Sequence, residues 1–311
     1  MRARVSEGSG FFAALDQSGG STPSALAAYG IGTDAYTDDD RMFALMHAMR
    51  VRVMTAPSFN SSKILAAILF ERTMDGDSMG MPVPTYLWRE RGIVPFLKVD
   101  RGVEAEANGV RMMKPMPGLD ALLERAGKLG IFGTKMRSVI NLASPTGIAA
   151  VLDQQFALAR AIASHGLAPI IEPEVLVASP QKRDAEAILE AELRRRLDLL
   201  DGDTEVILKL TIPSVTNQYL PLARHPRVLR LVALSGGYDR AEACRLLARN
   251  CEMIASFSRA LLDGLNRSMD DATFDAALSV AIEEIFHAST IKEDPPRPAA
   301  PAPQTNELSG G

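Results

Sequence analysis

The chain has 311 residues, of which 47% are hydrophobic and 23% are charged, a balance typical of globular proteins and unlike that of disordered chains. Its formal net charge is −4 at pH 7, and the basic residues are scattered along the sequence rather than gathered in a run. Proteins that bind nucleic acids usually carry a basic patch, so the charge pattern argues against DNA and RNA as partners.

The sequence offers little support for a metal site or a disulfide framework. Its cysteines and histidines are Cys244, Cys251, His47, His165, His225 and His287. None of them falls in the HxH, HExxH or CxxC spacing of common zinc sites. We therefore expect no metal and no other cofactor, and the chemistry must come from other side chains.

The two ends of the chain carry different signals. The first 20 residues have charges and glycines where a secretion signal has its apolar core, and no run of 18 apolar residues follows anywhere. We expect a cytoplasmic protein with no membrane partner. Residues 294–311, DPPRPAAPAPQTNELSGG, contain one large aliphatic residue, Leu308. Such a segment buries too little apolar surface to offset its ordering entropy, so we expect a catalytic domain at 1–293 and a disordered tail after it.

Eight short apolar runs alternate with helical patterns, which predicts βα units and a parallel sheet. The runs span residues 11–16, 64–71, 93–100, 133–141, 168–175, 205–210, 228–234 and 253–258. The helical patterns include 38–53, which begins with three aspartates, and 147–164, 184–200 and 240–250. A closed (β/α)8 barrel fits eight such units better than an open doubly wound sheet, because closure leaves no edge strand to protect.

Charged residues lie at or near the carboxyl ends of these predicted strands. Residues i and i+2 of a strand point to the same face. Three pairs have this spacing: Lys98 with Asp100, Lys135 with Arg137, and Glu172 with Glu174. In addition, Asp16 ends the first strand and Lys209 lies one residue from the end of the sixth. Barrel enzymes place their chemistry at this end, so we expect charges from at least five strands to meet in one site.

This cluster has two interpretations. One is structural, a layer of ion pairs that caps the barrel without catalysis. The other is chemical: a lysine amine in a dry cavity beside other cations loses proton affinity and attacks a carbonyl, and the resulting imine accepts electrons when a carbon–carbon bond breaks. A neighbouring carboxylate would remove water and move protons. We favour the second, because desolvated charges at the mouth of a barrel are more often functional than not.

Two glycine-containing turns follow predicted strands. After the seventh strand, Ser235, Gly236 and Gly237 precede a helix that starts near Asp239. Backbone N–H groups in such a turn can bind a phosphate, and Arg259 just past the eighth strand would add a charge. The segment DQSGGS after the first strand is a weaker signal for the other end of a bisphosphorylated substrate. The alternative for either turn is chain geometry alone.

In these segments the chain resembles the class I, Schiff-base fructose-bisphosphate aldolase family in its shorter bacterial form. The matching segments run from about residue 10 to residue 289 and are AALDQSGGSTP, MRVRVMTAPSF, AAILFERTMDG, VPFLKVDRGVE, FGTKMRSVIN, PIIEPEVL, ILKLTIPSV, VALSGGYDR and IASFSRALLDGL. The resemblance implies reversible cleavage of fructose 1,6-bisphosphate to dihydroxyacetone phosphate and glyceraldehyde 3-phosphate, in glycolysis and gluconeogenesis.

The resemblance also implies roles for single residues. Lys209 would form the imine, with Glu172 transferring protons beside Glu174. Asp16 would act on the C4 hydroxyl during cleavage, and Lys135 would support the charge there. The residues implied in substrate binding are Arg137 along the site, Ser235, Gly236, Gly237 and Arg259 at the C1 phosphate, and Ser18, Ser21 and Lys98 at the other phosphate.

Two segments depart from the longer animal-type members of the family. Those enzymes have a basic pair where residues 22–25 are Thr-Pro-Ser-Ala, and they end in a tyrosine that exchanges protons, whereas the last tyrosine here is Tyr238. The contacts to the second phosphate and the group that protonates the carbanion are therefore left open. So are the oligomeric state, with a homo-oligomer among the options, and the preference between one- and two-phosphate ketoses. The alternatives are a Schiff-base aldolase or transaldolase for another phosphosugar, or a non-catalytic barrel that binds a partner.

Overall fold

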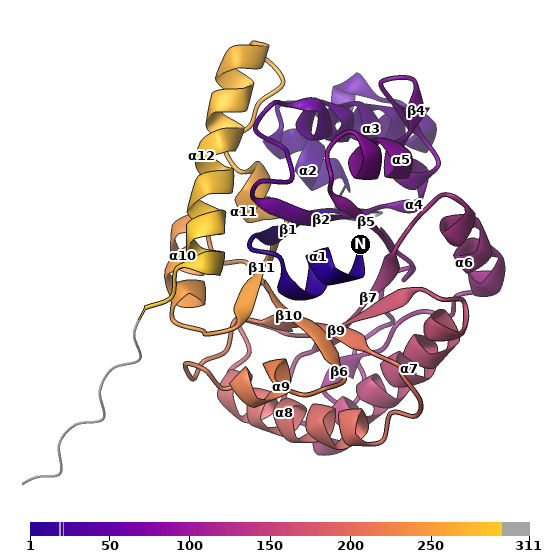
Figure 1. Ribbon diagram of the computed structural model, residues 1–311, viewed down its shortest axis with the longest axis vertical. Helices are drawn as coiled ribbons and strands as arrows, with labels where there is room; N and C mark the ends of the chain where they lie inside the picture. Colours follow the sequence, from indigo (N-terminus) through magenta and orange to yellow (C-terminus); the bar gives the residue numbers. More distant parts are fainter. Residues whose placement is uncertain (19, 21, 294–311) are drawn as a thin grey trace, which may run out of the picture.

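The computed structural model describes residues 1–18, 20 and 22–293 of the chain. Eight parallel strands form a closed barrel surrounded by helices (Figure 1). In order around the ring they are β1 (Phe11–Leu15), β2 (Ile64–Leu69), β5 (Val94–Lys98), β7 (Gly133–Ile140), β8 (Ala168–Val175), β9 (Val206–Thr211), β10 (Val228–Leu234) and β11 (Met253–Phe257). Pairing of β5 with β7 and of β11 with β1 closes the ring. The predicted single-domain barrel is confirmed, and each predicted strand overlaps one of these strands, although β9 ends one residue after the predicted 205–210 run.

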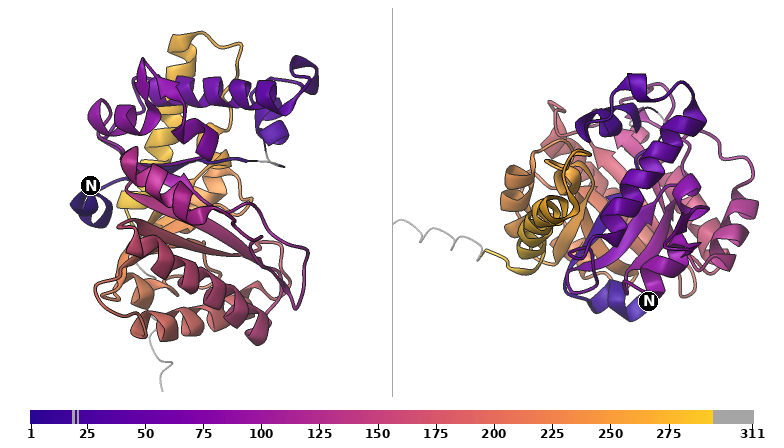
Figure 2. Two further views of the ribbon diagram at one scale, coloured as in Figure 1. Left: turned by 90° about the vertical axis from the view of Figure 1, so that its right-hand side faces the viewer. Right: turned by 90° about the horizontal axis from the view of Figure 1, so that it is seen from above.

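Helices cover the outside of the barrel (Figure 2). They include α2 (Thr22–Ala28), α3 (Asp39–Thr55), α4 (Glu71–Met74), α5 (Val83–Arg89), α6 (Leu119–Lys128), α7 (Pro145–Ser164), α8 (Lys182–Asp198), α9 (Leu220–Ala223), α10 (Arg240–Ala248), α11 (Arg259–Leu262) and α12 (Asp271–Thr290). The four helices predicted from the sequence correspond to α3, α7, α8 and α10. Asp38, Ser144 and Asp239 cap α3, α7 and α10, each accepting a hydrogen bond from a backbone N–H of the first turn.

Several elements had no counterpart in the sequence-based prediction. Helix α12 lies along α10 at the edge of the molecule (Figure 1). Strand β6 (Val110–Arg111) pairs antiparallel with the end of β7, and β3 (Asp77–Ser78) with β4 (Met81–Pro82) forms a small hairpin. Among the described residues, no helix is both long and apolar enough to cross a membrane.

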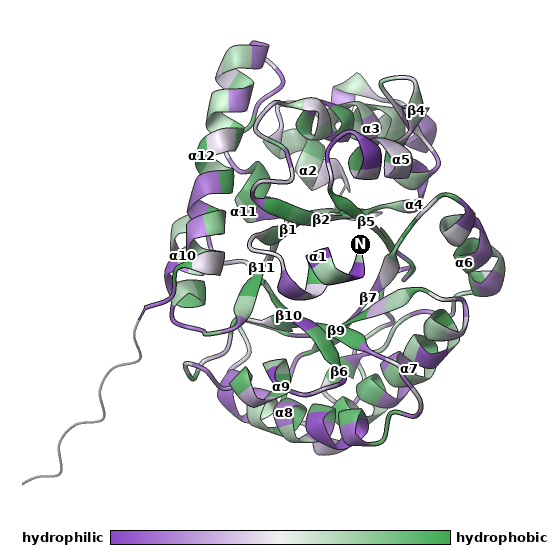
Figure 3. Cartoon of the chain, in the orientation of Figure 1, coloured by the Kyte–Doolittle hydropathy of each residue, from purple (hydrophilic) through white to green (hydrophobic). Residues whose placement is uncertain are grey.

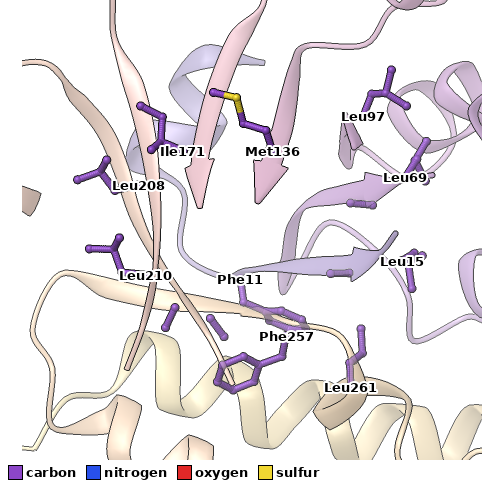
Figure 4. Close-up of a cluster of buried hydrophobic side chains, with 14 of the residues drawn as sticks. Phe11, Leu15, Leu69, Leu97, Met136, Ile171, Leu208, Leu210, Phe257 and Leu261 are labelled. Carbon is purple, nitrogen blue, oxygen red and sulfur yellow. The ribbon is translucent and has the colours of Figure 1, made fainter. Parts of the chain in front are cut away.

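Residues along each barrel strand alternate between two apolar layers, since successive side chains point to opposite faces. The outer layer lies between the strands and the helices and includes Phe11, Leu15 and Phe257 (Figure 4). The inner layer fills the barrel and includes Phe12, Phe96, Ile170, Ile207 and Val232. The strands are accordingly mostly hydrophobic, while the helices carry hydrophobic and hydrophilic residues together (Figure 3).

The inner layer leads directly to the charged residues at the carboxyl ends of the strands. On β1, Phe12 and Ala14 belong to the inner layer, and the next position on that face is Asp16. On β9, inner Ile207 is followed two residues later by Lys209. The period of two that buries the apolar residues therefore also turns these charges toward the mouth of the barrel.

The opposite end of the barrel is closed by the short helix α1 (Arg2–Glu7), which crosses the barrel in the view of Figure 1. Its Val5 is fully buried and joins the inner apolar layer. Arg230 of β10 fixes this segment, donating to the backbone oxygens of Ser6 at 2.6 Å and Gly8 at 3.1 Å. The amino end is thus sealed by apolar contacts and by arginine bonded to carbonyls.

Candidate active site

Five ionisable side chains from five strands meet at the carboxyl end of the barrel. They are between 3% and 9% exposed: Asp16 after β1, Lys98 on β5, Lys135 on β7, Glu172 on β8 and Lys209 on β9. The structure thus brings together the residues that the strand-end pattern selected, and water has little access to any of them.

Two carboxylates and two lysines form a continuous chain of contacts at the centre of the site. The Lys135 Nζ lies 2.8 Å from Asp16 Oδ2 and 2.8 Å from Glu172 Oε2. The other oxygen of Glu172, Oε1, lies 3.2 Å from Lys209 Nζ. Glu172 is therefore shared between two ammonium groups, while Lys135 is shared between two carboxylates.

The pKa values of Lys135 and Asp16 differ from those of ordinary lysines and aspartates. Burial alone would raise the pKa of Asp16, but the ammonium of Lys135, with those of Lys209 and Lys98, holds that pKa well below its usual range. Burial alone would lower the pKa of Lys135, but the carboxylates of Asp16 and Glu172 raise it well above its usual range. Both groups are therefore held in their charged forms, and Lys135 is a poor nucleophile.

The three lysines differ in how firmly they are held. Lys98 Nζ lies 2.6 Å from Asp100 Oδ1 and donates to the Asp100 backbone oxygen, also at 2.6 Å. Lys135 has two close carboxylates, whereas the ionic contact of Lys209 within the described residues is a single one at 3.2 Å. Lys209 is accordingly the amine that can most readily leave its partner and attack a substrate.

A second ion pair, Arg137 with Glu174, lies beside this cluster. Arg137 Nη1 is 2.6 Å from Glu174 Oε2, and the Arg137 side chain is 41% exposed. Burial alone would lower the pKa of the Arg137 guanidinium, but Glu174 and Glu172 raise it. Asp100 links Arg137 to Lys98 of the central cluster. Its Oδ2 accepts a hydrogen bond from the Arg137 backbone N–H at 3.2 Å, and its Oδ1 accepts one from Lys98 Nζ. Arg137 is thus a fixed, accessible cation at the rim.

The turn after β10 has the geometry expected for an anion cradle. Gly236 and Gly237 have φ values of 61° and 112°, which other residues rarely adopt, and a Cβ on Gly236 would lie 2.5 Å from Val177 Cγ2. A Cβ on Gly237 would lie 3.7 Å from Arg259 Nη2. The exposed guanidinium of Arg259 therefore reaches the turn that begins at Ser235, and it forms no ion pair with any described residue.

The loop after β1 is described only in part. Ser18 lies in its described portion, while Ser21 lies outside the described residues. Between Asp16 and Ser18, Gln17 donates from Nε2 to Ser258 Oγ at 2.5 Å. Ser258 directly precedes Arg259, so this contact ties the loop after β1 to the candidate phosphate site.

Known proteins of similar sequence show which family this chain belongs to. A family model described as glycolytic fructose-bisphosphate aldolase class-I matches residues 2–209. The chain belongs to the class I fructose-bisphosphate aldolase family. A fructose-bisphosphate aldolase class 1 of Porphyromonas gingivalis is 54% identical over 280 residues, which cover 90% of this chain and 95% of that protein. The one of Synechocystis sp. is 54% identical over 280 residues, which cover 90% of this chain and 93% of that protein.

The fold agrees with this family. The chain is similar to a solved fructose-bisphosphate aldolase from Plasmodium falciparum, in complex with TRAP and a small-molecule inhibitor, with a TM-score of 0.70 and 19% identity. The similarity covers 94% of each chain. The chain is therefore a lyase of the metal-independent class I type that acts on fructose bisphosphate, and the family, fold and enzyme class predicted from the sequence are confirmed. Within the described residues, no three His, Cys, Asp or Glu side chains are grouped to hold a metal ion.

One residue that sequence reasoning missed is Gln155 of α7, which is fully buried. Its Oε1 accepts a hydrogen bond from the Glu172 backbone N–H at 2.9 Å, and its Nε2 donates to Ser138 Oγ at 3.1 Å. The pairing of β8 with β9 ends at Ile171, whereas its pairing with β7 continues to Val175. Gln155 thus holds the backbone where β8 leaves β9. A glutamine on the buried face of the predicted 147–164 helix was the available signal.

A second missed residue is Arg50 of α3, which is 1% exposed. It donates to Thr73 Oγ1 at 2.7 Å and to the Gln17 backbone oxygen. Burial lowers the pKa of Arg50 to about 10, against the attraction of Asp16. Arg50 therefore supports the loop after β1 from behind. An arginine four residues after Met46, within a run of apolar helix positions, was its signal in the sequence.

Proposed function

We propose that the enzyme cleaves fructose 1,6-bisphosphate through an imine formed on Lys209. The observation that carries this proposal is the chain of contacts from Asp16 through Lys135 and Glu172 to Lys209. It supplies a loosely held amine, a carboxylate within reach of it, and a second carboxylate kept ionised by a lysine. An imine mechanism needs these three groups.

The first half of the proposed reaction forms the imine. Glu172 accepts the proton that Lys209 loses, the neutral amine attacks the ketose C2 carbonyl to give a carbinolamine, and Glu172 then donates that proton to the hydroxyl, which leaves as water. The product is a protonated imine, which withdraws electrons from the neighbouring carbons. Lys135 keeps its proton between the two carboxylates and holds Glu172 close to the reacting nitrogen.

The second half breaks the C3–C4 bond. Asp16 accepts the proton of the C4 hydroxyl, the C4 oxygen becomes the carbonyl of glyceraldehyde 3-phosphate, and the bonding electrons move into the imine to form an enamine. Protonation at C3 and addition of water then release dihydroxyacetone phosphate and restore Lys209. The low pKa of Asp16 keeps this carboxylate ionised and ready to accept the hydroxyl's hydrogen bond.

The two phosphates are proposed to bind to two different sets of residues at the mouth of the barrel. Ser235, Gly236, Gly237 and Arg259 would hold the C1 phosphate, since the turn offers backbone N–H groups and the guanidinium lies beside it. Lys98, Ser18 and Ser21 would face the other phosphate, and Arg137, with Glu174 as its partner, would line the site between them.

The proposal extends to the organisation of the chain. We infer a catalytic domain at 1–293 that works in the cytoplasm, where glycolytic enzymes meet their substrates. Two contacts support its end point: Glu293 N donates to the Ala248 oxygen at 2.9 Å, and Lys292 Nζ donates to the Met253 oxygen at 2.7 Å. The tail predicted at 294–311 lies outside the described residues. A homo-oligomer stays a prediction from the sequence.

Chemical trapping tests the mechanism. Borohydride added with dihydroxyacetone phosphate should reduce the imine, inactivate the enzyme, and leave the added mass on the peptide that contains ILKLTIP. Lys209→Met is the matched variant and should take up no mass. Mass on Lys135 or Lys98 in the unaltered enzyme, or cleavage activity in Lys209→Met equal to that of the unaltered enzyme, would refute the assignment.

A further inference from the structure

A second buried ion pair lies behind the candidate active site and takes no part in the proposed chemistry. Lys182 and Glu186 occupy the first turns of α8, and their side chains are 10% and 0% exposed. Lys182 Nζ lies 2.5 Å from Glu186 Oε1. A pair one helical turn apart is common on protein surfaces, but this one is removed from water.

The remaining hydrogen bonds of the pair all go to one segment. Lys182 Nζ donates to the Ile212 backbone oxygen at 2.9 Å and to Ser214 Oγ at 3.1 Å. Glu186 Oε2 accepts from the Ser214 backbone N–H at 2.9 Å. Residues 212–214 directly follow β9, and Lys209 lies three residues before Ile212. The pair therefore holds the backbone immediately beyond the proposed imine lysine.

The end of β9 also contacts the turn proposed to bind phosphate. Thr211 Oγ1 donates to the Val175 backbone oxygen at 2.7 Å, and a Cβ on Gly236 would lie 3.6 Å from Thr211 Cγ2. The segment that the ion pair holds therefore follows directly on Thr211, which contacts both the end of β8 and the turn after β10.

Stability alone is a weak reason for such a pair. Removing two charges from water is costly, and apolar replacements of similar volume are often neutral or stabilising. What an apolar pair would not supply is the three hydrogen bonds to residues 212–214. We propose that Lys182 and Glu186 are positioning residues, which fix the segment after β9 and thereby the distance between Lys209 and the turn after β10. This inference rests on the proposed role of Lys209.

The test is a comparison of two alterations in the same helix. Lys182→Met/Glu186→Leu removes the pair and keeps its volume. Arg196→Met, in the last turn of α8, is the matched control: Arg196 is 6% exposed and bonded to Asp153 Oδ1 at 2.7 Å, far along the helix from residues 212–214. For each variant we would measure kcat and KM for fructose 1,6-bisphosphate, the rate of borohydride-trapped labelling with dihydroxyacetone phosphate, and the melting temperature.

The double variant should lose about tenfold or more in labelling rate and kcat, and KM should rise, because small displacements of reacting groups are costly. Its melting temperature should fall no further than that of Arg196→Met, so that the kinetic loss cannot be a general loss of folding. Arg196→Met should change the melting temperature and leave the labelling rate unaltered. A double variant with unaltered kinetics overturns the inference, as does an equal kinetic loss in Arg196→Met.

Ser214→Ala keeps the test decisive if the double variant does not fold. Ser214 is exposed, and this change removes only the contact of its Oγ with Lys182. We expect a two- to threefold lower labelling rate, about the effect of one weakened hydrogen bond, and an unaltered rate would count against the inference. Labelling of another lysine in the unaltered enzyme would refute the proposed function instead, so the two failures are distinguishable.

Discussion

The two ends of the barrel treat buried charge differently. At the amino end, Arg230 donates to two backbone oxygens, and burial lowers the pKa of its guanidinium with no carboxylate to oppose the shift. At the carboxyl end, Lys135 is buried more deeply but lies between two carboxylates, which raise its pKa. The same strands supply both ends. A cation bonded to carbonyls fixes the chain, whereas charges bonded to each other can exchange partners with a substrate.

The largest effect should come from Lys209→Met at the carboxyl end. Loss of the amine removes the proposed imine, so the rate of cleavage should fall on the order of 10³-fold or more. The melting temperature should change little, because Glu172 keeps Lys135 as a partner. Steady-state kinetics and thermal unfolding of one preparation provide the check. Substantial residual activity would contradict the assignment of the chemistry to Lys209 at the carboxyl end of the barrel.

Asp16→Asn should lower kcat by about 10²–10³-fold, since a general base is lost. Imine formation does not require Asp16 in the proposed sequence of steps, so borohydride trapping with dihydroxyacetone phosphate should continue. A variant that neither cleaves nor labels would show that Asp16 is needed earlier than C3–C4 cleavage.

Arg259→Ala should act on binding rather than on chemistry. Loss of a charge-assisted hydrogen bond to phosphate costs about 1.5–3 kcal/mol, which raises KM for the bisphosphate about 10- to 100-fold. Arg259→Lys, which keeps the charge, should recover part of the loss. An unaltered KM would mean that the turn at Ser235 serves chain geometry alone.

The Asp16–Lys135 pair should also appear in the pH dependence of stability. Asp16 has a lowered pKa in the folded state, so its contribution is present above the unfolded value of about 3.9 and is lost as pH falls further. Lys135 has a raised pKa, so its contribution is present below the unfolded value of about 10.4 and is lost as pH rises through the folded value. Denaturant unfolding of Asp16→Asn should therefore depend less steeply on pH below pH 4 than that of the unaltered protein.

The smallest kinetic effect is expected at the amino end. Arg230→Met leaves the backbone oxygens of Ser6 and Gly8 without their donor, and we expect a loss of about 1–3 kcal/mol in unfolding free energy. The kinetic constants should stay as they are. A fall in kcat at full folding would show that the two ends are coupled.

The sequence predicted the residues that act through their own strand, because strand period and strand ends are local properties. Lys135 and Glu172 were placed by the spacing of charges in apolar runs. Prediction was less good where a helix begins directly after a strand: the run at 64–71 was expected to be one strand, but β2 ends at Leu69 and Glu71 starts α4. The boundary between strand and helix depends on packing against other segments, which the residues of the run alone do not show.

Residues that act through another element could not be found in this way. Gln155 and Arg50 lie on helices and touch the site only after the helices have packed on the barrel. Lys182 lies before the helix predicted at 184–200, so the sequence did not place it one helical turn from Glu186. Helix α1 was missed as well, because six residues give too short a pattern to distinguish from a loop. The positions of all these residues depend on contacts between segments that are distant in the sequence.

The shared position of Glu172 has a consequence for the charge balance of the catalytic cycle. Asp16, Glu172, Lys135 and Lys209 form one connected set, and in their ionised forms their charges add to zero. In the proposed cycle, Glu172 takes the proton that Lys209 loses, so the sum stays at zero while the amine is free, and Glu172 gives that proton to the departing hydroxyl as the cationic imine forms. Asp16 takes up a proton as the neutral enamine forms, so the sum again stays at zero. The proposed steps thus move protons within the set and never leave a net charge in a region with little access to counterions.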